Sequence, residues 1–183
     1  MEFYRKGVSL KLFFLIILIA VLATLLLTEI GLFLAGSALG YEMEFEFLNT
    51  QAGEDIDSEY DAMFISSGRL MALIFQVTLF YVIILLSGSR YLLGFLFFPL
   101  GYRMISYILA MAAPDTFLSQ AEFLIANYYD ISTGLIIAII SIYFIILNLH
   151  AVIRTSLSWK RYFQGALFSL LLFAIIVFLT NLI

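Results

Sequence analysis

The stretch YLLGFLFFPLGYRMISYILAMAAPD, residues 91–115, decides how this chain folds. It is apolar enough to lie in lipid, yet it carries Pro99, Gly101 and Arg103 in its middle. A straight membrane helix through it would bring the Arg103 guanidinium near the centre of the bilayer, which costs roughly 2.5–3.5 kcal/mol on insertion scales. A break between Pro99 and Gly101 avoids that cost, and proline favours such a break because it removes a backbone hydrogen bond.

Two placements of this stretch are consistent with its composition. In the first, residues 91–100 form an interfacial segment on the membrane surface, and Arg103 stands at the water boundary, where it opens a helix over residues 102–113. In the second, residues 91–113 form one kinked span, since neighbouring helices can satisfy the carbonyl groups that a proline leaves free. We predict the first placement.

The overall composition is that of an integral membrane protein. Of the 183 residues, 64% are hydrophobic and only 12% are charged, whereas about 25% are charged in soluble domains. The chain has no cysteine, so it offers no disulfide and no thiolate nucleophile. With one histidine, His150, a zinc site made of protein ligands is hard to build. We predict no cofactor and, from a formal net charge of only −4, no nucleic-acid partner.

Apolar runs of helical length predict a single all-α membrane domain over residues 1–183, with about five spans. The first run begins after basic residues and is too long for the apolar core of a signal peptide, about 7–15 residues, so we expect a retained helix. The predicted spans are residues 11–36, 69–86, 102–113, 133–153 and 164–181. A capping-box pattern at Ser119 and Glu122 predicts a short amphipathic helix over residues 120–129.

The positions of the charges predict the orientation of these spans. With a cytoplasmic N-terminus, eight of the nine basic residues fall inside and eleven of the thirteen acids fall outside, as expected from the enrichment of Lys and Arg in cytoplasmic loops. The exceptions are Arg69 among the bases and Glu2 and Glu29 among the acids. Residues 41–66 are then an acidic extracytoplasmic loop, whose alternating start at 41–47 fits either a paired strand or an interfacial segment.

Glu29 is the one carboxylate inside a predicted span. An ionisable group within the membrane is by default a functional candidate, as a proton or cation site or as half of an ion pair. The alternative is that Glu29 lies near the outer interface and extends into the acidic loop. Gln76, in the second predicted span, is a candidate for the same ion path or for a hydrogen bond between helices.

Arg90 and Arg103 flank the predicted interfacial segment. A guanidinium binds phosphate through two parallel hydrogen bonds, so the two arginines are candidates for contact with lipid phosphate. Arg103 has two further interpretations, as an interfacial anchor and as the partner of a carboxylate on another chain.

The acidic loop contains a run of carboxylates that superficially resembles a calcium loop, whose oxygens at alternate positions converge on the ion. Counted from Asp55, the sixth position is Tyr60 instead of glycine and the twelfth is Ser66 instead of glutamate. We therefore predict no metal site, and a solvated or partner-facing acidic surface. Its residues are Glu54, Asp55, Asp57, Glu59 and Asp61.

Membrane enzymes carry recognisable constellations, such as paired histidines with glutamate, a serine with a histidine, or paired aspartates. None of these is in the sequence, so we predict no enzyme. We expect a non-catalytic membrane subunit or scaffold that docks membrane lipids or other membrane protein subunits through its helix faces and acidic loop. The alternative is a small transporter or channel component in which Glu29, Gln76 and Arg103 line one path.

The second half of the chain, residues 91–183, resembles the bacterial Yip1-type membrane domain. The residues that carry the resemblance are Leu100-Gly-Tyr-Arg103, Ala110-Met-Ala-Ala-Pro114, Leu149-His150 and Ser156-Leu-Ser-Trp-Lys160. The resemblance implies a five-span bundle of the bacterial inner membrane, associated with membrane organisation or trafficking, without catalytic residues. The acidic loop departs from the usual pattern of that family.

Overall fold

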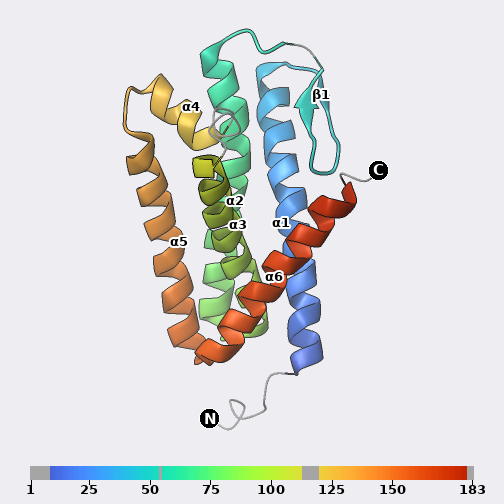
Figure 1. Ribbon diagram of the computed structural model, residues 1–183, viewed down its shortest axis with the longest axis vertical. Coiled ribbons are helices and arrows are strands. Elements are labelled where there is room, and N and C mark those ends of the chain that lie inside the picture. Colours follow the sequence, from blue (N-terminus) through green and yellow to red (C-terminus); the bar gives the residue numbers. More distant parts are fainter. Residues whose placement is uncertain (1–8, 54, 113–119, 181–183) are drawn as a thin grey trace.

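The computed structural model describes residues 9–53, 55–112 and 120–180 as a bundle of helices (Figure 1). Within this part of the chain, five helices are long and apolar enough to cross a membrane, which confirms the prediction of an all-α bundle with about five candidate spans. Successive long helices run in opposite directions (Figure 1). The long helices are α1 (Leu10–Leu39), α2 (Glu59–Ser87), α3 (Gly94–Ala112), α5 (Thr133–Thr155) and α6 (Trp159–Thr180).

The two ends of the bundle differ in structure and charge. One end, here called the hairpin end, holds the short helix α4 (Ala121–Tyr128) and an antiparallel pair of strands, β1 (Met43–Glu44) and β2 (Gln51–Ala52). For residues 41–47 the sequence left a paired strand and an interfacial segment open, and the structure shows the paired strand at Met43–Glu44. The opposite end, here called the basic end, holds the start of α1 and the connection from α5 to α6 (Figure 1). Its basic residues are Lys11, Arg90, Arg154, Lys160 and Arg161.

Helix α2 begins at Glu59, well before the predicted span 69–86, so the predicted loop 41–66 is too long. The Ser58 hydroxyl accepts a hydrogen bond from the Asp61 amide at 3.1 Å, as an N-cap residue does. Glu59 and Asp61 lie in the first turn, where negative charge is favourable because of the helix dipole. The carboxylates that indicated a loop therefore stabilise the start of a helix.

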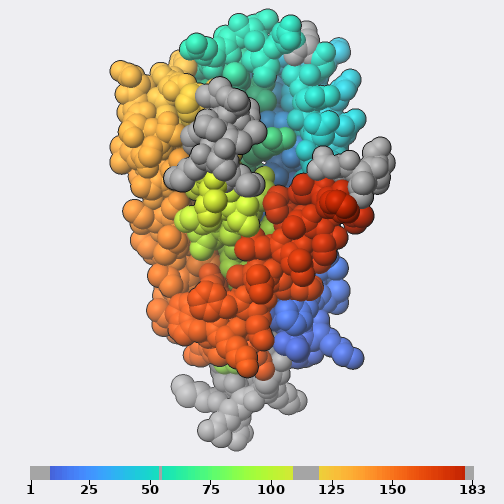
Figure 2. Space-filling model, in the orientation of Figure 1, coloured from blue at the N-terminus to red at the C-terminus, as the bar shows by residue number. Residues whose placement is uncertain are grey.

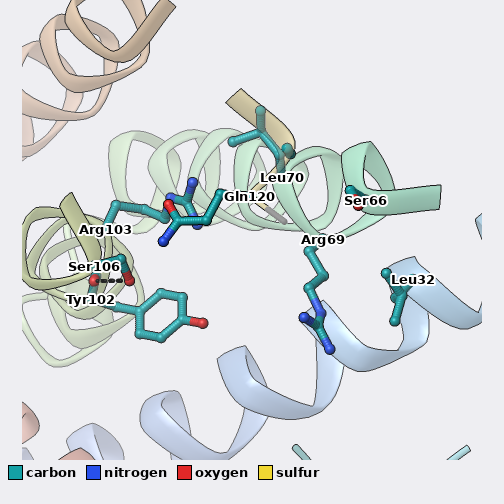
Figure 3. A pocket seen from close by; sticks show the side chains of 9 residues that line it. Leu32, Ser66, Arg69, Leu70, Tyr102, Arg103, Ser106 and Gln120 are labelled. Atoms are coloured by element: carbon teal, nitrogen blue, oxygen red, sulfur yellow. Dashed lines mark hydrogen bonds between the residues drawn. The ribbon is translucent and has the colours of Figure 1, made fainter. Parts of the chain in front are cut away.

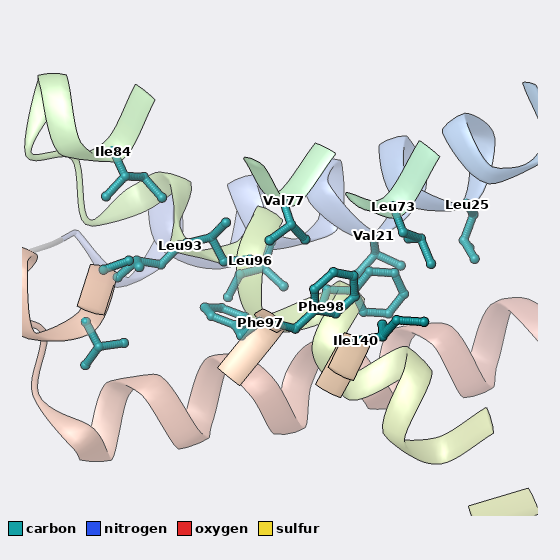
Figure 4. Close-up of a cluster of buried hydrophobic side chains, with 14 of the residues drawn as sticks. Val21, Leu25, Leu73, Val77, Ile84, Leu93, Leu96, Phe97, Phe98 and Ile140 are labelled. Carbon is teal, nitrogen blue, oxygen red and sulfur yellow. The ribbon is translucent and has the colours of Figure 1, made fainter. Parts of the chain in front are cut away.

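The first half of α3 lies at the centre of the core (Figure 4). Leu96 and Phe98 are 0% exposed and Phe97 is 2% exposed, and this part of α3 packs against α1, α2, α5 and α6. The predicted interfacial segment over 91–100 is therefore wrong. Residues Tyr91–Leu93 form a 3₁₀ turn that leads directly into α3, and residues 93–99 are all buried.

The predicted helix break between Pro99 and Gly101 is also wrong, because α3 continues through Pro99 from Gly94 to Ala112. Proline has no N–H for the carbonyl four residues earlier, that of Phe95. The Gln76 side chain of α2 donates to this carbonyl at 3.3 Å, and Asn148 of α5 donates to the next one, that of Leu96, at 3.1 Å. The alternative of one span over this stretch is thus the one observed.

Helices α1 and α2 cross where two glycines meet. A Cβ added to Gly31 would overlap the Gly68 carbonyl, and one added to Gly68 would overlap the Gly31 carbonyl. Small residues at a membrane helix crossing let the backbones approach closely, so this position tolerates no side chain.

The remaining helices lie close to their predicted positions, with shifted ends. The first span, predicted at 11–36, extends to Leu39, and the last, predicted at 164–181, begins already at Trp159. Ser119 of the predicted capping box lies outside the described residues. In the space-filling view, part of α3 is visible between α5 and α6 (Figure 2).

Candidate functional site

Two ion pairs lie near the hairpin end, and both carboxylates are buried, whereas the Arg69 side chain is 41% exposed. In the first, Arg69 of α2 donates from Nη2 to Oε2 of Glu29 on α1 at 3.0 Å, and the backbone N–H of Thr50 donates to the same oxygen at 3.0 Å. Glu29 is 4% exposed and Thr50 is also 4% exposed. Among the predicted alternatives, Glu29 is thus half of an ion pair. Its contact with the Thr50 amide also places it against the 41–66 segment, which the second alternative predicted, so Glu29 links α1, α2 and the hairpin connection.

In the second pair, Arg103 of α3 donates from Nη2 to Oε1 of Glu122 on α4. The Tyr107 hydroxyl donates to the same oxygen at 2.7 Å, and the Arg103 guanidinium carbon lies 5.1 Å from the centre of the Tyr107 ring. Glu122 is 0% exposed. The prediction that Arg103 opens a helix at the water boundary is therefore wrong, since it lies within α3 and pairs with a carboxylate of its own chain.

A polar cavity of about 220 Å³ lies between these two ion pairs (Figure 3). Helices α1, α2 and α3 and the start of α4 contribute its lining. The Arg69 guanidinium and the Tyr102 hydroxyl point into the same space (Figure 3). The lining residues are Leu32, Ser66, Arg69, Leu70, Tyr102, Arg103, Ser106, Gln120 and Ala121.

Several polar atoms around the cavity are buried without a hydrogen-bond partner among the described residues. Arg69 Nε and Arg103 Nε are two such donors, and Gln120 Oε1 and Glu122 Oε2 are two such acceptors. A buried polar atom left without a partner costs about 1–3 kcal/mol, so native structures rarely contain several at one place. This concentration makes the cavity the candidate site.

The structure does not bring Arg90 and Arg103 together, and lipid contact by either residue stays a prediction. Arg90 Nε donates to the carbonyl of Thr155 at the end of α5, at 2.7 Å. The last carbonyls of a helix have no partner inside it, and a cation there is favourable. Arg90 precedes α3 at the basic end, whereas Arg103 lies along α3 toward the hairpin end.

Gln76 is 1% exposed and does not line the cavity. Its Nε2 donates to Thr24 Oγ1 at 2.7 Å as well as to the Phe95 carbonyl, and Thr24 in turn donates to the Ala20 carbonyl. Its second predicted role, a hydrogen bond between helices, is therefore the observed one.

One tyrosine holds the acidic segment against the start of α2. Asp55, Asp57 and Glu59 are exposed, while Glu54 lies outside the described residues. The Tyr41 hydroxyl accepts from the Asp57 amide at 3.0 Å and donates to Asp61 at 2.9 Å. The first contact lowers the pKa of Tyr41, burial and Asp61 raise it, and the net shift is upward, so the hydroxyl stays protonated. No group of three metal-ligating side chains occurs in the described part of the chain.

Sequence reasoning missed Glu122, Tyr107 and Arg69 as site residues. Glu122 had been assigned to a helix cap, and Tyr107 has no distinctive sequence context. Arg69 carried a usable signal, because it and Glu29 were both exceptions to the distribution of charge and are in fact partners. Two opposite charges that both violate an orientation rule are candidates for pairing.

Comparison with models of protein families, with curated proteins and with solved structures finds no match for this chain. The resemblance of residues 91–183 to the Yip1-type domain therefore stays a prediction. What bears on the function is the set of contacts that the chain itself makes.

Proposed function

We propose that this protein is a non-catalytic integral membrane subunit or scaffold, which associates with lipids and other membrane proteins through its helix faces. The observation that carries the proposal is that most of the polar side chains buried among the long helices bind one helix to another. Gln76 links α2 to α1 and α3, Asn148 links α5 to α3, and Glu29 links α1 to α2. Such contacts maintain a shape and leave few groups for a reaction.

The alternative, a transporter or channel component, has less support. Glu29, Gln76 and Arg103 would have to line one path, yet each has a different partner, and Glu29 and Gln76 are not among the cavity-lining residues. Toward the basic end the core is filled by Leu93, Leu96 and other fully buried apolar side chains. A polar path along the bundle would have to pass through this apolar layer.

An apolar groove beside the glycine crossing of α1 and α2 supports a docking role. Its volume is about 410 Å³, and three of its lining side chains, Leu34, Met71 and Phe75, are 60%, 61% and 64% exposed. Small-residue crossings with exposed apolar borders are favourable surfaces for a further membrane helix. The exposed Asp55 and Asp57 at the hairpin end provide a second, aqueous surface.

We propose a cytoplasmic basic end, because Lys and Arg are enriched on that side of membrane proteins. The five basic residues at this end support that orientation. The resemblance to the Yip1-type domain supports the bacterial inner membrane as the location.

Extraction with a mild maltoside detergent, followed by native mass spectrometry, tests the scaffold proposal. We expect a defined membrane subunit to remain bound, and to be lost when the groove is altered by Met71→Ala together with Phe75→Ala. The matched control is Leu171→Ala with Phe163→Ala, which changes exposed apolar residues of α6 instead. Equal retention in both double variants would argue against docking at the groove.

Flux measurements in proteoliposomes test the alternative. We expect no conductance or proton-coupled flux above that of empty vesicles. A flux that disappears in Glu29→Gln and is unaffected by Arg90→Gln would overturn the scaffold proposal in favour of transport.

A further inference from the structure

We propose that the cavity between the two ion pairs is a binding site for a phosphate group, held by the guanidinium groups of Arg69 and Arg103. This proposal goes beyond the scaffold function and does not depend on it. The sequence paired Arg103 with Arg90 as a phosphate contact. In the structure Arg69, and not Arg90, lines the same cavity as Arg103.

The first argument is the state of the two guanidinium groups. Each carries five N–H donors in a fixed planar arrangement, and each uses Nη2 for one carboxylate. Arg69 Nε and Arg103 Nε are buried and have no hydrogen-bond partner among the described residues. Both arginines line the cavity, so an anion placed there can accept hydrogen bonds from both, and phosphate oxygens match guanidinium geometry well.

The second argument is the placement of the two carboxylates. Glu29 and Glu122 are not among the lining residues of the cavity. Each carboxylate accepts a second hydrogen bond, Glu29 from the Thr50 amide and Glu122 from the Tyr107 hydroxyl. The cavity is therefore lined by the two arginines and not by the carboxylates that pair with them, and this pairing lowers the cost of placing the guanidinium groups in the membrane.

The third argument is the rest of the lining. Ser66 and Tyr102 bring hydroxyl groups to the cavity, while the Ser106 hydroxyl donates to the Tyr102 carbonyl. The Gln120 carboxamide can turn its nitrogen toward a ligand, because the two ends of an amide are exchanged by rotation. Hydroxyl and amide donors are the usual partners of phosphate oxygens beside arginine.

The fourth argument is size. Pockets for drug-sized ligands have volumes of about 300–1,000 Å³, and this cavity, at about 220 Å³, is smaller. It suits a single phosphate group. Two sources share that chemistry, the phosphate of a phospholipid headgroup and free inorganic phosphate. Helix α3, which carries Tyr102 and Arg103, is visible at the surface between α5 and α6 (Figure 2).

Binding to the purified full-length protein in maltoside detergent distinguishes the two sources. One arm adds phosphatidylglycerol and measures bound lipid by native mass spectrometry, with a monogalactosyl diacylglycerol, which has no phosphate, as the matched lipid. The other arm titrates inorganic phosphate by calorimetry. Binding of the phospholipid alone identifies a headgroup site, and binding of inorganic phosphate identifies a free-anion site. Binding of neither probe, or equal binding of both lipids, overturns the proposal.

Three variants locate the binding. Arg69→Gln combined with Glu29→Gln removes one guanidinium without leaving a carboxylate unpaired, and we expect a loss of affinity of about tenfold to a hundredfold, the range for hydrogen bonds to charged groups. Ser106→Leu fills the cavity without changing either ion pair, and we expect a similar loss. Arg90→Gln, which lies outside the cavity, is the control and should bind as the unaltered protein does.

The size-exclusion profile and thermal unfolding of each variant show whether it is folded. Should the charge variant fail to fold, the Ser106→Leu variant still decides the question. Among the described residues, the hydrogen bond of the Ser106 side chain goes to the carbonyl of Tyr102 in its own helix, so no contact between helices is lost with it. Unchanged phosphate binding in folded Ser106→Leu, or an equal loss in Arg90→Gln, would exclude the cavity as the site.

Discussion

The two halves of the bundle are held together by different forces. Toward the basic end, α3 is surrounded by apolar side chains such as Leu96 and Phe98, which are 0% exposed. Toward the hairpin end, the same helix is held by the Arg103 ion pair and by the Tyr107 hydroxyl. In lipid there is little hydrophobic gain from moving an apolar side chain into the protein, so packing and polar contacts carry the association of helices.

The comparison teaches that the two kinds of contact respond differently to substitution. Truncating an apolar side chain of the core removes packing contacts only. Removing one member of an ion pair also leaves a charge without a partner. Variants in the two halves should therefore differ in effect, in the order given below.

The largest effect is expected from Glu122→Leu, which leaves the buried Arg103 guanidinium without its carboxylate. Breaking a buried pair by removing one partner costs about 3–5 kcal/mol. The free energy of unfolding in mixed micelles measures it. The double variant Arg103→Met with Glu122→Leu removes both charges and should recover most of the stability. A single variant as stable as the unaltered protein would contradict the role of the pair.

A smaller effect is expected from Phe98→Ala in the apolar half. Phe98 packs against the rings of Tyr102 and Phe173. The cavity left behind costs about 24 cal/mol per Å³, or about 2 kcal/mol for most of a phenyl ring, without the additional transfer cost of a soluble protein. The same unfolding measurement applies, with Phe163→Ala, which is 65% exposed, as the control. A loss larger than that of Glu122→Leu would reverse the comparison.

Gln76→Leu tests how α3 tolerates its proline. The variant removes the donor to the Phe95 carbonyl. Such bonds in membrane proteins contribute about 0.6 kcal/mol on average and at most about 1.7 kcal/mol, so we expect a loss between these two values. In a Pro99→Ala background, residue 99 regains the N–H that normally bonds this carbonyl, so the loss should be smaller. A double-mutant cycle measures the coupling. Identical losses in both backgrounds would show that Gln76 acts only through Thr24.

The smallest effect is expected from Arg90→Gln at the basic end. It removes the contact to the Thr155 carbonyl, and interactions of a cation with a helix C-terminus contribute about 0.3–1 kcal/mol. Hydrogen exchange should become faster only in the last turn of α5. The control is Lys160→Gln, an exposed residue of α6. Faster exchange throughout α5 would indicate that Arg90 stabilises more than the helix end.

The fold was largely predictable because membrane helices are marked by hydropathy and by their capping residues. The failures lie where a residue far along the chain changes the local rule. Pro99 predicts a break only if nothing replaces the lost N–H, and the side chains that donate to the freed region, Gln76 and Asn148, come from other helices. Their amide groups were visible in the sequence, but their positions relative to Pro99 were not.

The candidate site was predicted only in part. Arg103 was recognised as a phosphate candidate, but its partner arginine was chosen from the nearest residues in the sequence instead of from the neighbouring helix. The α2 helix brings Arg69 to the cavity because it begins at Glu59, and the predicted loop had placed Arg69 at the water boundary. Glu122 was predicted as a cap residue from its spacing to Ser119. Its pairing with Arg103 was not foreseen, because the two residues were assigned to opposite sides of the membrane.

The contact between Glu29 and Arg69 has a consequence for the biosynthesis of the protein. An arginine on the far side of the first two helices works against the charge bias that directs their insertion. Pairing with Glu29 neutralises that charge within the first two helices, before α3 has been synthesised. We therefore expect α1 and α2 to enter the bilayer together as a hairpin, with the glycine crossing already closed, and the later helices to assemble on this pair.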